Sequence, residues 1–531
     1  MIEANIRIPA PANEPVLPYS PGSPERAQLK DALKRMAGEK IEIPLVIGGK
    51  QVRTSKTIEV RMPHRHQHVL AVAHEGDGAH VEQAIAAAQA ARADWAAMPF
   101  QQRAAIFLKA AELLATKYRP LINAATMLGQ SKTAHQAEID AACESIDFLR
   151  FNVAFAHEIH SQQPQSAPGM WNLTDYRPLD GFVLAVTPFN FTSIGVNLPT
   201  APAIMGNTVV LKPASTAIYS AWIFMEVLRE AGLPDGVINF VPGKGSEVGR
   251  VALASPALGG IHFTGSTGTF NGMWKTVGET GGKDFIFAHA SAIDDLDALA
   301  TAIVRGGFEY QGQKCSACSR VYVPESVWAR LKPRLQEMIA EIRVGDVSDF
   351  RNFMGAVIDE ASFRNVSSYI ELAKSSPEAS IVAGGETDKR EGYIVRPTLV
   401  QLTNPRHRIM VEEIFAPLVG VYVYPDGKYL EALRECDQSA AYALTGAIFA
   451  RDRKAIATAM GELRFAAGNF YVNDKPSGAV VGQQPFGGSR ASGTNDKAGS
   501  ALNLVRWISA RTIKENFAPP VRVAYPFMGA E

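Results

Sequence analysis

This sequence of 531 residues contains few cysteines and has no excess of positive or negative charge. Four cysteines are too few for a disulfide framework in a chain of this length, and they suit a reducing compartment. The 53 basic side chains are balanced by 53 acidic ones, so the chain lacks the positive surface that binds a nucleic acid or an anionic membrane. We therefore expect neither a nucleic acid nor a membrane among its partners.

The sequence also has little that could cross a membrane. The segment 181–211 runs 31 residues without a charge, but Asn197, Pro199 and Pro202 would break the hydrogen bonds of a bilayer helix and bury its amides. A buried strand, a loop and a short helix fit this segment better. The first 25 residues have neither the apolar core of a secretory signal nor the Arg-rich face of a mitochondrial presequence. We expect a cytoplasmic protein, or a mitochondrial matrix protein if the source is eukaryotic.

What the sequence does contain is the composition of a globular α/β protein, 47% hydrophobic and 20% charged. Apolar positions at three- and four-residue spacing predict helices over about 80–157. From 181 onward, short apolar runs alternate with helical segments, which indicates a doubly wound parallel sheet buried on both faces. Such sheets bind ligands beyond the carboxyl ends of their strands, which directs attention to the loops 188–191, 212–215 and 263–266.

A second α/β half is expected over about 284–485, with no internal repeat or low-complexity tract. The first 30 residues, rich in proline and serine, are typical of a surface arm or a loosely ordered segment. The tail 501–523 contains an alternating apolar strand that fits the sheet edge of another subunit. We therefore expect a homodimer or a higher homo-oligomer.

The most specific local indication of chemistry is the C-x-x-C pair formed by Cys315 and Cys318 in GQKCSACSR. Such a pair fits a redox dithiol, half of a zinc site, one nucleophile beside an ordinary cysteine, or two buried cysteines. Zinc is disfavoured because there is no second C-x-x-C and the one histidine cluster, 64–66, is far away in the sequence, so we expect no metal. The loop 263–266, which opens a helix, and Lys212, which follows a strand, favour the nucleophile.

Seven motifs together resemble the aldehyde dehydrogenase superfamily. In chain order they are GFVLAVTPFNF, NTVVLKPAS, IHFTGS, GETGGKDF, GQKCSACSR, EEIFAP and QQPFGGSRASGTNDK, and the resemblance covers nearly the whole chain after the N-terminal arm. Within the superfamily, QAEIDAACESIDFLRFN and VVGQQPFGG are most similar to the 1-pyrroline-5-carboxylate dehydrogenases, also called L-glutamate γ-semialdehyde dehydrogenases. This resemblance implies NAD-dependent oxidation of L-glutamate γ-semialdehyde to L-glutamate in proline catabolism.

The same resemblance implies an α/β, aldehyde dehydrogenase-like fold. It would have a doubly wound Rossmann-type cofactor domain, an α/β catalytic domain and a small β oligomerisation element. The expected segments are the N-terminal arm with the helical part of the NAD-binding domain (1–156), an oligomerisation hairpin (157–181), the Rossmann-type NAD-binding core (182–279), the catalytic domain (280–485), a return to the NAD-binding domain (486–507) and an oligomerisation tail (508–531).

Three residues match the catalytic groups of the superfamily. Cys315 matches the nucleophile that attacks the aldehyde, and this chemistry needs thiolate character, which a nearby cation or helix N-terminus can supply. Asn190 matches the side-chain amide that stabilises the oxyanion together with the backbone N–H of Cys315. Glu279 matches the carboxylate that activates water to hydrolyse the thioester. Cys318 matches no role, and we expect it to be structural.

Further matches concern the cofactor, which the resemblance predicts to be NAD. Lys212 matches the residue that meets the adenosine ribose, Ser266 the pyrophosphate contact, and Glu413 with Phe415 the pair that positions the nicotinamide ribose and ring. Ser215 stands where many aldehyde dehydrogenases carry a glutamate that holds ribose hydroxyls. A carboxylate there would repel a 2′-phosphate and serine does not, so the use of NADP stays open.

The substrate that the resemblance implies is a small aldehyde with an amino acid head. It needs an apolar clamp for its methylenes and polar groups for its zwitterion. The matching residues are Phe191 and Phe486 for the clamp, Glu144 for the ammonium, and Ser316, Gly478 and Ala479 for the carboxylate. Ala479 stands where relatives have serine, so one hydroxyl donor is missing. We expect the substrate to come from another enzyme, with at most transient contact with a separate proline dehydrogenase.

One departure from the family pattern lies between Ser266 and Glu279, which only 12 residues separate. A parallel crossover takes about a dozen residues before its second strand begins and about five more for that strand. We therefore predict that the sheet loses a strand or that the crossover helix is cut to a turn. Two alternatives follow: an impaired or inactive homologue whose Glu279 does not reach the thioester, and a dehydrogenase of another semialdehyde. Ala416 replaces a family glycine, and we expect it to restrict the backbone near the nicotinamide.

Overall fold

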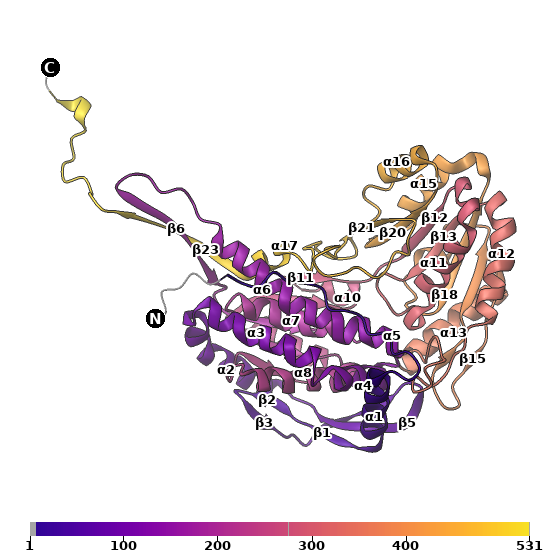
Figure 1. The fold of residues 1–531 in the computed structure, drawn as a ribbon, viewed down its shortest axis with the longest axis horizontal. Helices are drawn as coiled ribbons and strands as arrows, with labels where there is room; N and C mark the ends of the chain where they lie inside the picture. Colours follow the sequence, from indigo (N-terminus) through magenta and orange to yellow (C-terminus); the bar gives the residue numbers. More distant parts are fainter. Residues whose placement is uncertain (1–6, 274–275, 530–531) are drawn as a thin grey trace.

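The computed structural model of the chain describes residues 7–273 and 276–529. It has two α/β lobes, each built on one seven-stranded sheet, and a two-stranded ribbon that projects from the first lobe (Figure 1). Within these described residues, no helix combines the length and the apolarity that crossing a bilayer requires.

The sheet of the first lobe forms because short apolar runs lie side by side as parallel strands buried on both faces. Its strand order is β11-β10-β7-β8-β9-β2-β3, and β2 pairs antiparallel with both β9 and the edge strand β3. The strands are β2 (Leu45–Ile47), β3 (Lys50–Val52), β7 (Phe182–Val186), β8 (Val209–Lys212), β9 (Ile238–Phe240), β10 (Leu258–Thr264) and β11 (Thr276–Glu279).

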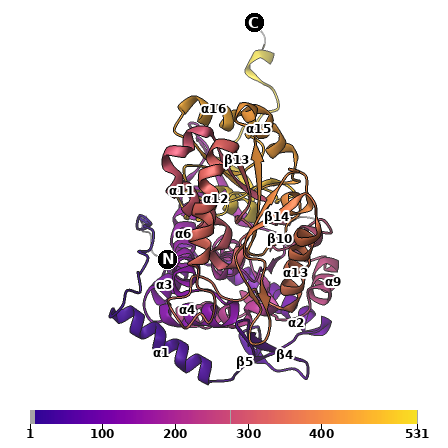
Figure 2. The same ribbon diagram turned by 90° about the vertical axis from the view of Figure 1, so that its right-hand side faces the viewer.

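Helices cover both faces of this sheet. Apolar side chains of α2 (Gly78–Ala97) and α9 (Gly245–Ala254) pack on one face. On the other face lie α3 (Phe100–Ala115), α4 (Arg119–Gln130), α6 (Ser145–Ser161), α7 (Thr192–Ile204) and α8 (Ile218–Ala231), with α1 (Pro24–Gly38) against α4. Figure 2 shows α1 at the base of this lobe. The helices expected over 80–157 are thus present.

The segment 1–156 was expected to be an arm followed by helices, and this was wrong for residues 41–74. Besides β2 and β3, this stretch forms a three-stranded sheet of β1 (Ile41–Ile43), β4 (Thr57–Met62) and β5 (Arg65–His74). Strand β2 joins the main sheet by pairing Val46 with Phe240. Such distant pairing leaves no local signal in three-residue strands.

The second lobe repeats the same layering. Its strand order is β14-β17-β18-β13-β12-β20-β21, with only the edge strand β14 antiparallel. The strands are β12 (Asp284–Ala288), β13 (Cys318–Pro324), β14 (Ala379–Ala383), β17 (Thr398–Leu402), β18 (Leu418–Tyr424), β20 (Thr445–Phe449) and β21 (Asn469–Val472). One face carries α11 (Leu296–Phe308) and α12 (Glu325–Ala340), and the other carries α13 (Glu360–Ser375), α15 (Tyr429–Gln438) and α16 (Arg453–Glu462).

The shortened crossover between β10 and β11 keeps its strand and shortens its helix. Helix α10 spans only Thr267–Phe270, a single turn, and β11 still pairs in parallel with β10, with Thr264 opposite Glu279. The second of the two predicted outcomes is therefore confirmed. Glu279 retains its place at the carboxyl end of a sheet strand.

The ribbon pairs β6 (Met170–Pro178) with β23 (Ile508–Asn516) in antiparallel register. The hairpin predicted over 157–181 is therefore wrong, because α6 continues to Ser161 and β6 takes its partner strand from the tail. Trp171 and Phe517 contact each other edge to face at the ribbon end and are 61% and 54% exposed. That the ribbon serves oligomerisation stays a prediction.

The N-terminal arm, residues 7–20, is anchored rather than loosely ordered. Tyr19 is buried and its hydroxyl donates to Glu138, which also accepts from the backbone N–H of Leu17. Glu138 in addition pairs with the guanidinium of Arg119, whose side chain is 8% exposed. Of the two expectations, a surface arm is confirmed and a loosely ordered segment is wrong. Composition could not distinguish them, because the partners that hold the arm lie about a hundred residues further along the chain.

We expect Glu138→Ala to lower the free energy of unfolding by about 3–5 kcal/mol, because it removes a buried partner of the Arg119 guanidinium. Burial raises the pKa of Glu138, but hydrogen bonds from Arg119 and Leu17 bring it below the usual 4.5. The stabilisation by the Glu138 carboxylate is therefore complete above the usual pKa of 4.5, and it is lost as the pH falls through the lowered pKa. Urea unfolding at several pH values measures it. The exposed pair Glu371 and Lys374 provides the control, since Glu371→Ala is expected to cost under about 0.5 kcal/mol. Equal losses in both variants would contradict this prediction.

Candidate functional site

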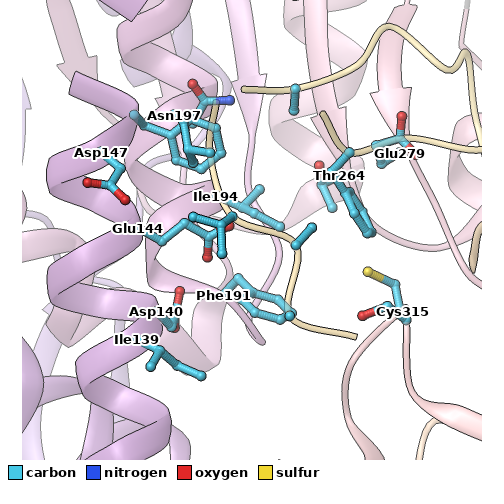
Figure 3. A pocket seen from close by; sticks show the side chains of 18 of the residues that line it. Ile139, Asp140, Glu144, Asp147, Phe191, Ile194, Asn197, Thr264, Glu279 and Cys315 are labelled. Carbon is cyan, nitrogen blue, oxygen red and sulfur yellow. The ribbon is translucent and has the colours of Figure 1, made fainter. Parts of the chain in front are cut away.

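A cavity of about 500 Å³ brings most of the predicted site residues together. The N-terminal arm, the helices around 136–148 and 191–198 and the ends of β10 and β11 contribute to its wall, together with the segments around 314–316 and 474–486. In Figure 3, Glu144 and Asp147 lie on one side, with Glu279 and Cys315 across the cavity. The predicted residues that line it are Glu144, Phe191, Glu279, Cys315, Ser316, Gly478, Ala479 and Phe486.

Cys315 is held by a tightly shaped backbone. It follows a 3-10 turn in which Tyr310 and Gln311 have φ angles of 51° and 56°, in the left-handed region that side chains rarely adopt. A Cβ atom on Gly282 would lie 2.2 Å from the carbonyl oxygen of Cys315. The third glycine of the GETGGK motif is therefore required for this close approach. Cys318, by contrast, begins β13 and is fully buried, as a structural cysteine would be.

The surroundings of Cys315 do not favour the thiolate form that the sequence analysis expected. Burial raises its pKa, and the nearby carboxyl groups of Asp284, Glu279 and Glu413 raise it further. No cation is among the described groups that shift this pKa, and burial and the carboxyl groups favour the protonated thiol. A proton acceptor must therefore remove this proton as the sulfur attacks.

Asn190 lies in the loop between β7 and α7 and is buried. Its side-chain Nδ2 donates to the backbone carbonyl of Gln313 at 3.1 Å, two residues before Cys315. One amide hydrogen thus fixes the side chain beside the Cys315 segment, and the second hydrogen on the same nitrogen is left for another acceptor. Asn190 itself is not among the described residues that line the cavity.

Glu279 shares the cavity with Cys315 although the crossover before it is short. Its Oε2 accepts a hydrogen bond from the backbone N–H of Gly488 at 3.1 Å. Burial raises the pKa of Glu279 well above the usual value, while Gly488 and Lys497 oppose this shift. Burial therefore disfavours the charged form, and the fraction of Glu279 present as a carboxylate base increases as the pH rises.

The helix side of the cavity is a network of buried polar groups. Glu144 ends a π-helical segment (Glu138–Glu144) and accepts from the hydroxyl of Ser193 at 2.8 Å. Burial, with the charge of Asp140, raises the pKa of Glu144 to about 8. Asp140 accepts from the backbone N–H groups of Thr192 and Ser193, which fixes the start of α7 next to Phe191.

A buried lysine that the sequence analysis missed supports this network. Lys132 pairs with Asp140 at 2.6 Å, and its ammonium group lies 4.4 Å from the ring centre of Phe191 and 4.5 Å from that of Tyr310. A cation between two aromatic rings holds both of them in place. No motif points to Lys132, because its partners lie in three other segments.

The opposite side of the cavity offers backbone donors and positive charge. Gly478 has φ 95°, a conformation that favours glycine, and Ala479 follows it on the cavity wall. Two lysines missed by the sequence analysis, Lys314 and Lys475, also line the cavity, and both pair with Glu309 at 2.9 Å. Each lies within three residues of a predicted site residue, and that proximity was the available signal.

The predicted cofactor residues lie outside this cavity, around the carboxyl ends of β8 and β10 and the 413–415 loop. Burial lowers the pKa of Lys212, and the charge of Glu75 opposes this shift. A largely buried ammonium at a strand end fits a ligand that brings hydroxyl or phosphate oxygens. Ser215 begins the 3-10 turn after β8. Ser266 is exposed and caps α10, accepting from the backbone N–H of Thr269 at 3.3 Å.

Glu413 and Phe415 lie close to the catalytic segment. Glu413 accepts from the backbone N–H of Gly282 at 2.8 Å, and burial raises its pKa. Phe415 has φ 59° and contacts Phe189 edge to face. Ala416 is not among the described residues with positive φ, so its side chain imposes no left-handed strain. That it restricts the backbone near the nicotinamide stays a prediction.

No group of three or more His, Cys, Asp or Glu side chains in residues 7–273 and 276–529 is arranged to hold a metal ion.

Comparison with known proteins gives consistent matches over the whole chain. The model of the "Aldehyde dehydrogenase family" matches residues 51–513. The "Delta-1-pyrroline-5-carboxylate dehydrogenase, mitochondrial" of Dictyostelium discoideum is 52% identical over 542 aligned positions, covering 99% of this chain and 97% of that protein.

Two solved structures are similar to this one. The crystal structure of the Delta-pyrroline-5-carboxylate dehydrogenase from Mycobacterium tuberculosis bound with NAD has a TM-score of 0.96 and 53% identity, covering 100% of both chains. Proline utilization A from Bdellovibrio bacteriovorus has a TM-score of 0.90 and 30% identity, covering 96% of this chain and 54% of that one.

Proposed function

Because this chain belongs to the aldehyde dehydrogenase family, we propose that it oxidises L-glutamate γ-semialdehyde, formed from 1-pyrroline-5-carboxylate, to L-glutamate with NAD. The observation that carries the proposal is the composition of one cavity. It holds the thiol of Cys315 and the carboxyl of Glu279 together with the buried carboxyl of Glu144 and the backbone of Gly478. These groups supply a nucleophile, a base and two recognition points for an amino acid head.

In the first step, Sγ of Cys315 bonds to the aldehyde carbon, and the electron pair of the C=O bond moves to its oxygen. The free amide hydrogen of Asn190 and the backbone N–H of Cys315 donate to this oxygen. The thiol proton passes to solvent water, which leaves Glu279 as a carboxylate for the second step. Lys212, Ser215, Ser266, Glu413 and Phe415 would hold NAD, which would supply the acceptor for the hydride of the thiohemiacetal carbon.

In the second step, the thioester on Cys315 is hydrolysed. Glu279 removes a proton from water, whose oxygen bonds to the acyl carbon. The carbon–sulfur bond then breaks to release the carboxylic acid, and the departing sulfur of Cys315 takes the proton from Glu279. Phe191 and Phe486 clamp the methylenes, while Glu144 and the backbone at Gly478 hold the ammonium and the carboxylate.

An NADH-formation assay tests this function. Steady NADH release that is fastest with L-glutamate γ-semialdehyde, compared with succinic semialdehyde and acetaldehyde, is the expected result. A preference for succinic semialdehyde would favour the alternative of another semialdehyde dehydrogenase. Binding of NAD without turnover of any aldehyde would favour an inactive homologue. Parallel assays with NADP determine whether Ser215 admits the 2′-phosphate.

We expect Ala479→Ser to lower the KM for the semialdehyde about tenfold, because a hydroxyl donor to a carboxylate adds roughly 1.5 kcal/mol. Ala479 lines the cavity directly after the left-handed Gly478, so the new hydroxyl would lie on the cavity wall. The KM for acetaldehyde, which has no carboxylate, serves as the control and should not change. An unchanged KM for the semialdehyde would show that its carboxylate binds elsewhere.

The cellular context belongs to the same proposal. Similarity to proline utilization A over about half of that protein's length supports a place in proline catabolism, with the semialdehyde supplied by a separate proline dehydrogenase. The Dictyostelium relative is named as mitochondrial, which agrees with a matrix protein if the source is eukaryotic. The exposed β6–β23 ribbon supports a homo-oligomer.

A further inference from the structure

The N-terminal arm forms part of the cavity wall. Asn13, Glu14 and Val16 line the cavity that also contains Cys315 and Glu279. Asn13 makes three side-chain hydrogen bonds there. Its Nδ2 donates to Oδ2 of Asp147 at 2.8 Å and to the backbone carbonyl of Val481 at 2.9 Å, and its Oδ1 accepts from Nε2 of Gln483 at 2.9 Å.

These bonds connect the two sides of the cavity. Asp147 lies in α6, one turn after Glu144, the predicted partner of the substrate ammonium. Val481 and Gln483 lie in the irregular segment 476–488, which also presents Gly478 and Ala479, the predicted carboxylate anchor. Asn13 therefore bridges the helix that would bind one charge of the zwitterion and the loop that would bind the other.

The arm is itself held firmly enough to act as a fixed bridge. The backbone N–H of Glu14 donates to the second oxygen of Asp147 at 2.7 Å, and the Glu14 carboxylate pairs with Arg119 and Arg150. Both oxygens of Asp147 thus receive donors from the arm. Burial raises the pKa of Asp147 to about 6, and the bonds from Asn13 and Glu14 oppose that shift.

We propose that Asn13 is a positioning residue that sets the separation between the ammonium and carboxylate subsites, and so the selectivity for aldehydes with an amino acid head. This inference rests on the function proposed above. Asn13 acts through Asp147 on the helix and through Val481 and Gln483 on the loop. A simple aldehyde uses neither subsite, so its oxidation does not depend on this bridge.

The test compares Asn13→Ala, which removes all three bonds, with Asn13→Asp, which keeps the size and one acceptor but places a carboxylate against Asp147. Tyr19→Phe is the matched control, since it weakens the arm's anchorage at Glu138 without touching the 476–488 loop. Binding of L-glutamate, the expected product, is measured by calorimetry. KM and kcat are measured for L-glutamate γ-semialdehyde and for acetaldehyde, and thermal melts report folding.

We expect both Asn13 variants to weaken L-glutamate binding and to raise the semialdehyde KM by about tenfold or more, with the acetaldehyde parameters unchanged. Tyr19→Phe should lower the melting temperature and leave the ratio between the two aldehydes as it was. Unchanged L-glutamate binding in Asn13→Ala, or equal losses for both aldehydes, would overturn the inference alone. An unaltered protein that neither binds L-glutamate nor oxidises the semialdehyde would overturn the proposed function, and this inference with it.

Discussion

Cys315→Ser is expected to reduce aldehyde oxidation by about 10⁴-fold or more, because a serine hydroxyl in place of the thiol is a far weaker nucleophile. Burial and three neighbouring carboxyl groups already disfavour a negative charge at this position. A hydroxyl, which is much less acidic than a thiol, would ionise even less. NADH formation with the semialdehyde measures the loss, and binding of NAD should persist because the predicted cofactor residues lie outside the cavity.

Cys318→Ser is the matched control for this prediction. It makes the same atomic change three residues away, at the start of β13, where the side chain is fully buried and faces no part of the cavity. Turnover close to that of the unchanged protein is expected. Loss of activity in Cys318→Ser with retention in Cys315→Ser would place the nucleophile on the other cysteine of the pair.

Glu279→Gln is expected to reduce steady-state turnover by about 10²- to 10⁴-fold, because it removes the base that activates water. The thioester should then accumulate, giving a burst of about one NADH per active site. Since burial raises the pKa of Glu279, its carboxylate form increases with pH, and thioester hydrolysis in the unchanged protein should accelerate as the pH rises through that pKa. Rapid-mixing measurements at several pH values give both the burst and the steady rate.

Glu144→Gln separates this effect from the general loss of a buried carboxyl in the same cavity. It should raise the semialdehyde KM and leave the ratio of burst to steady rate unchanged, because Glu144 lies on the opposite side from Cys315 (Figure 3). Normal turnover by Glu279→Gln would show that another group is the base. A burst without turnover in the unchanged protein would show that the shortened crossover impairs hydrolysis.

The main architecture was predictable because each buried parallel strand is a continuous apolar run followed by a helix. This pattern located β7, β8 and β10, and the residue count between Ser266 and Glu279 predicted the reduced α10. It missed β1 to β5. Of these, β1, β2 and β3 have only three residues each, and β2 joins the main sheet through a partner far along the chain. Composition also left open whether the arm is ordered, which depends on the burial of Tyr19 and its hydrogen bond to Glu138.

Within the site, sequence motifs identified the residues that would contact the substrate. They did not identify the residues that position those groups. Cys315, Glu279 and Phe191 lie in short, distinctive sequences and line one cavity. Lys132 and Asn13 have ordinary neighbours, and their contacts join segments that only the folded chain brings together. The pKa of Cys315 was likewise beyond sequence reasoning, because it depends on burial and on three carboxyl groups from separate segments.

The pairing of β6 with β23 has a consequence for biosynthesis. Arg177 and Ser509, which face each other across the ribbon, are 332 positions apart. During translation, β6 leaves the ribosome long before its partner exists and presents an unpaired edge for most of that time. Several nascent chains on one messenger RNA would therefore expose unpaired β6 strands at the same time. Chaperones that bind extended segments would bind β6 early in synthesis.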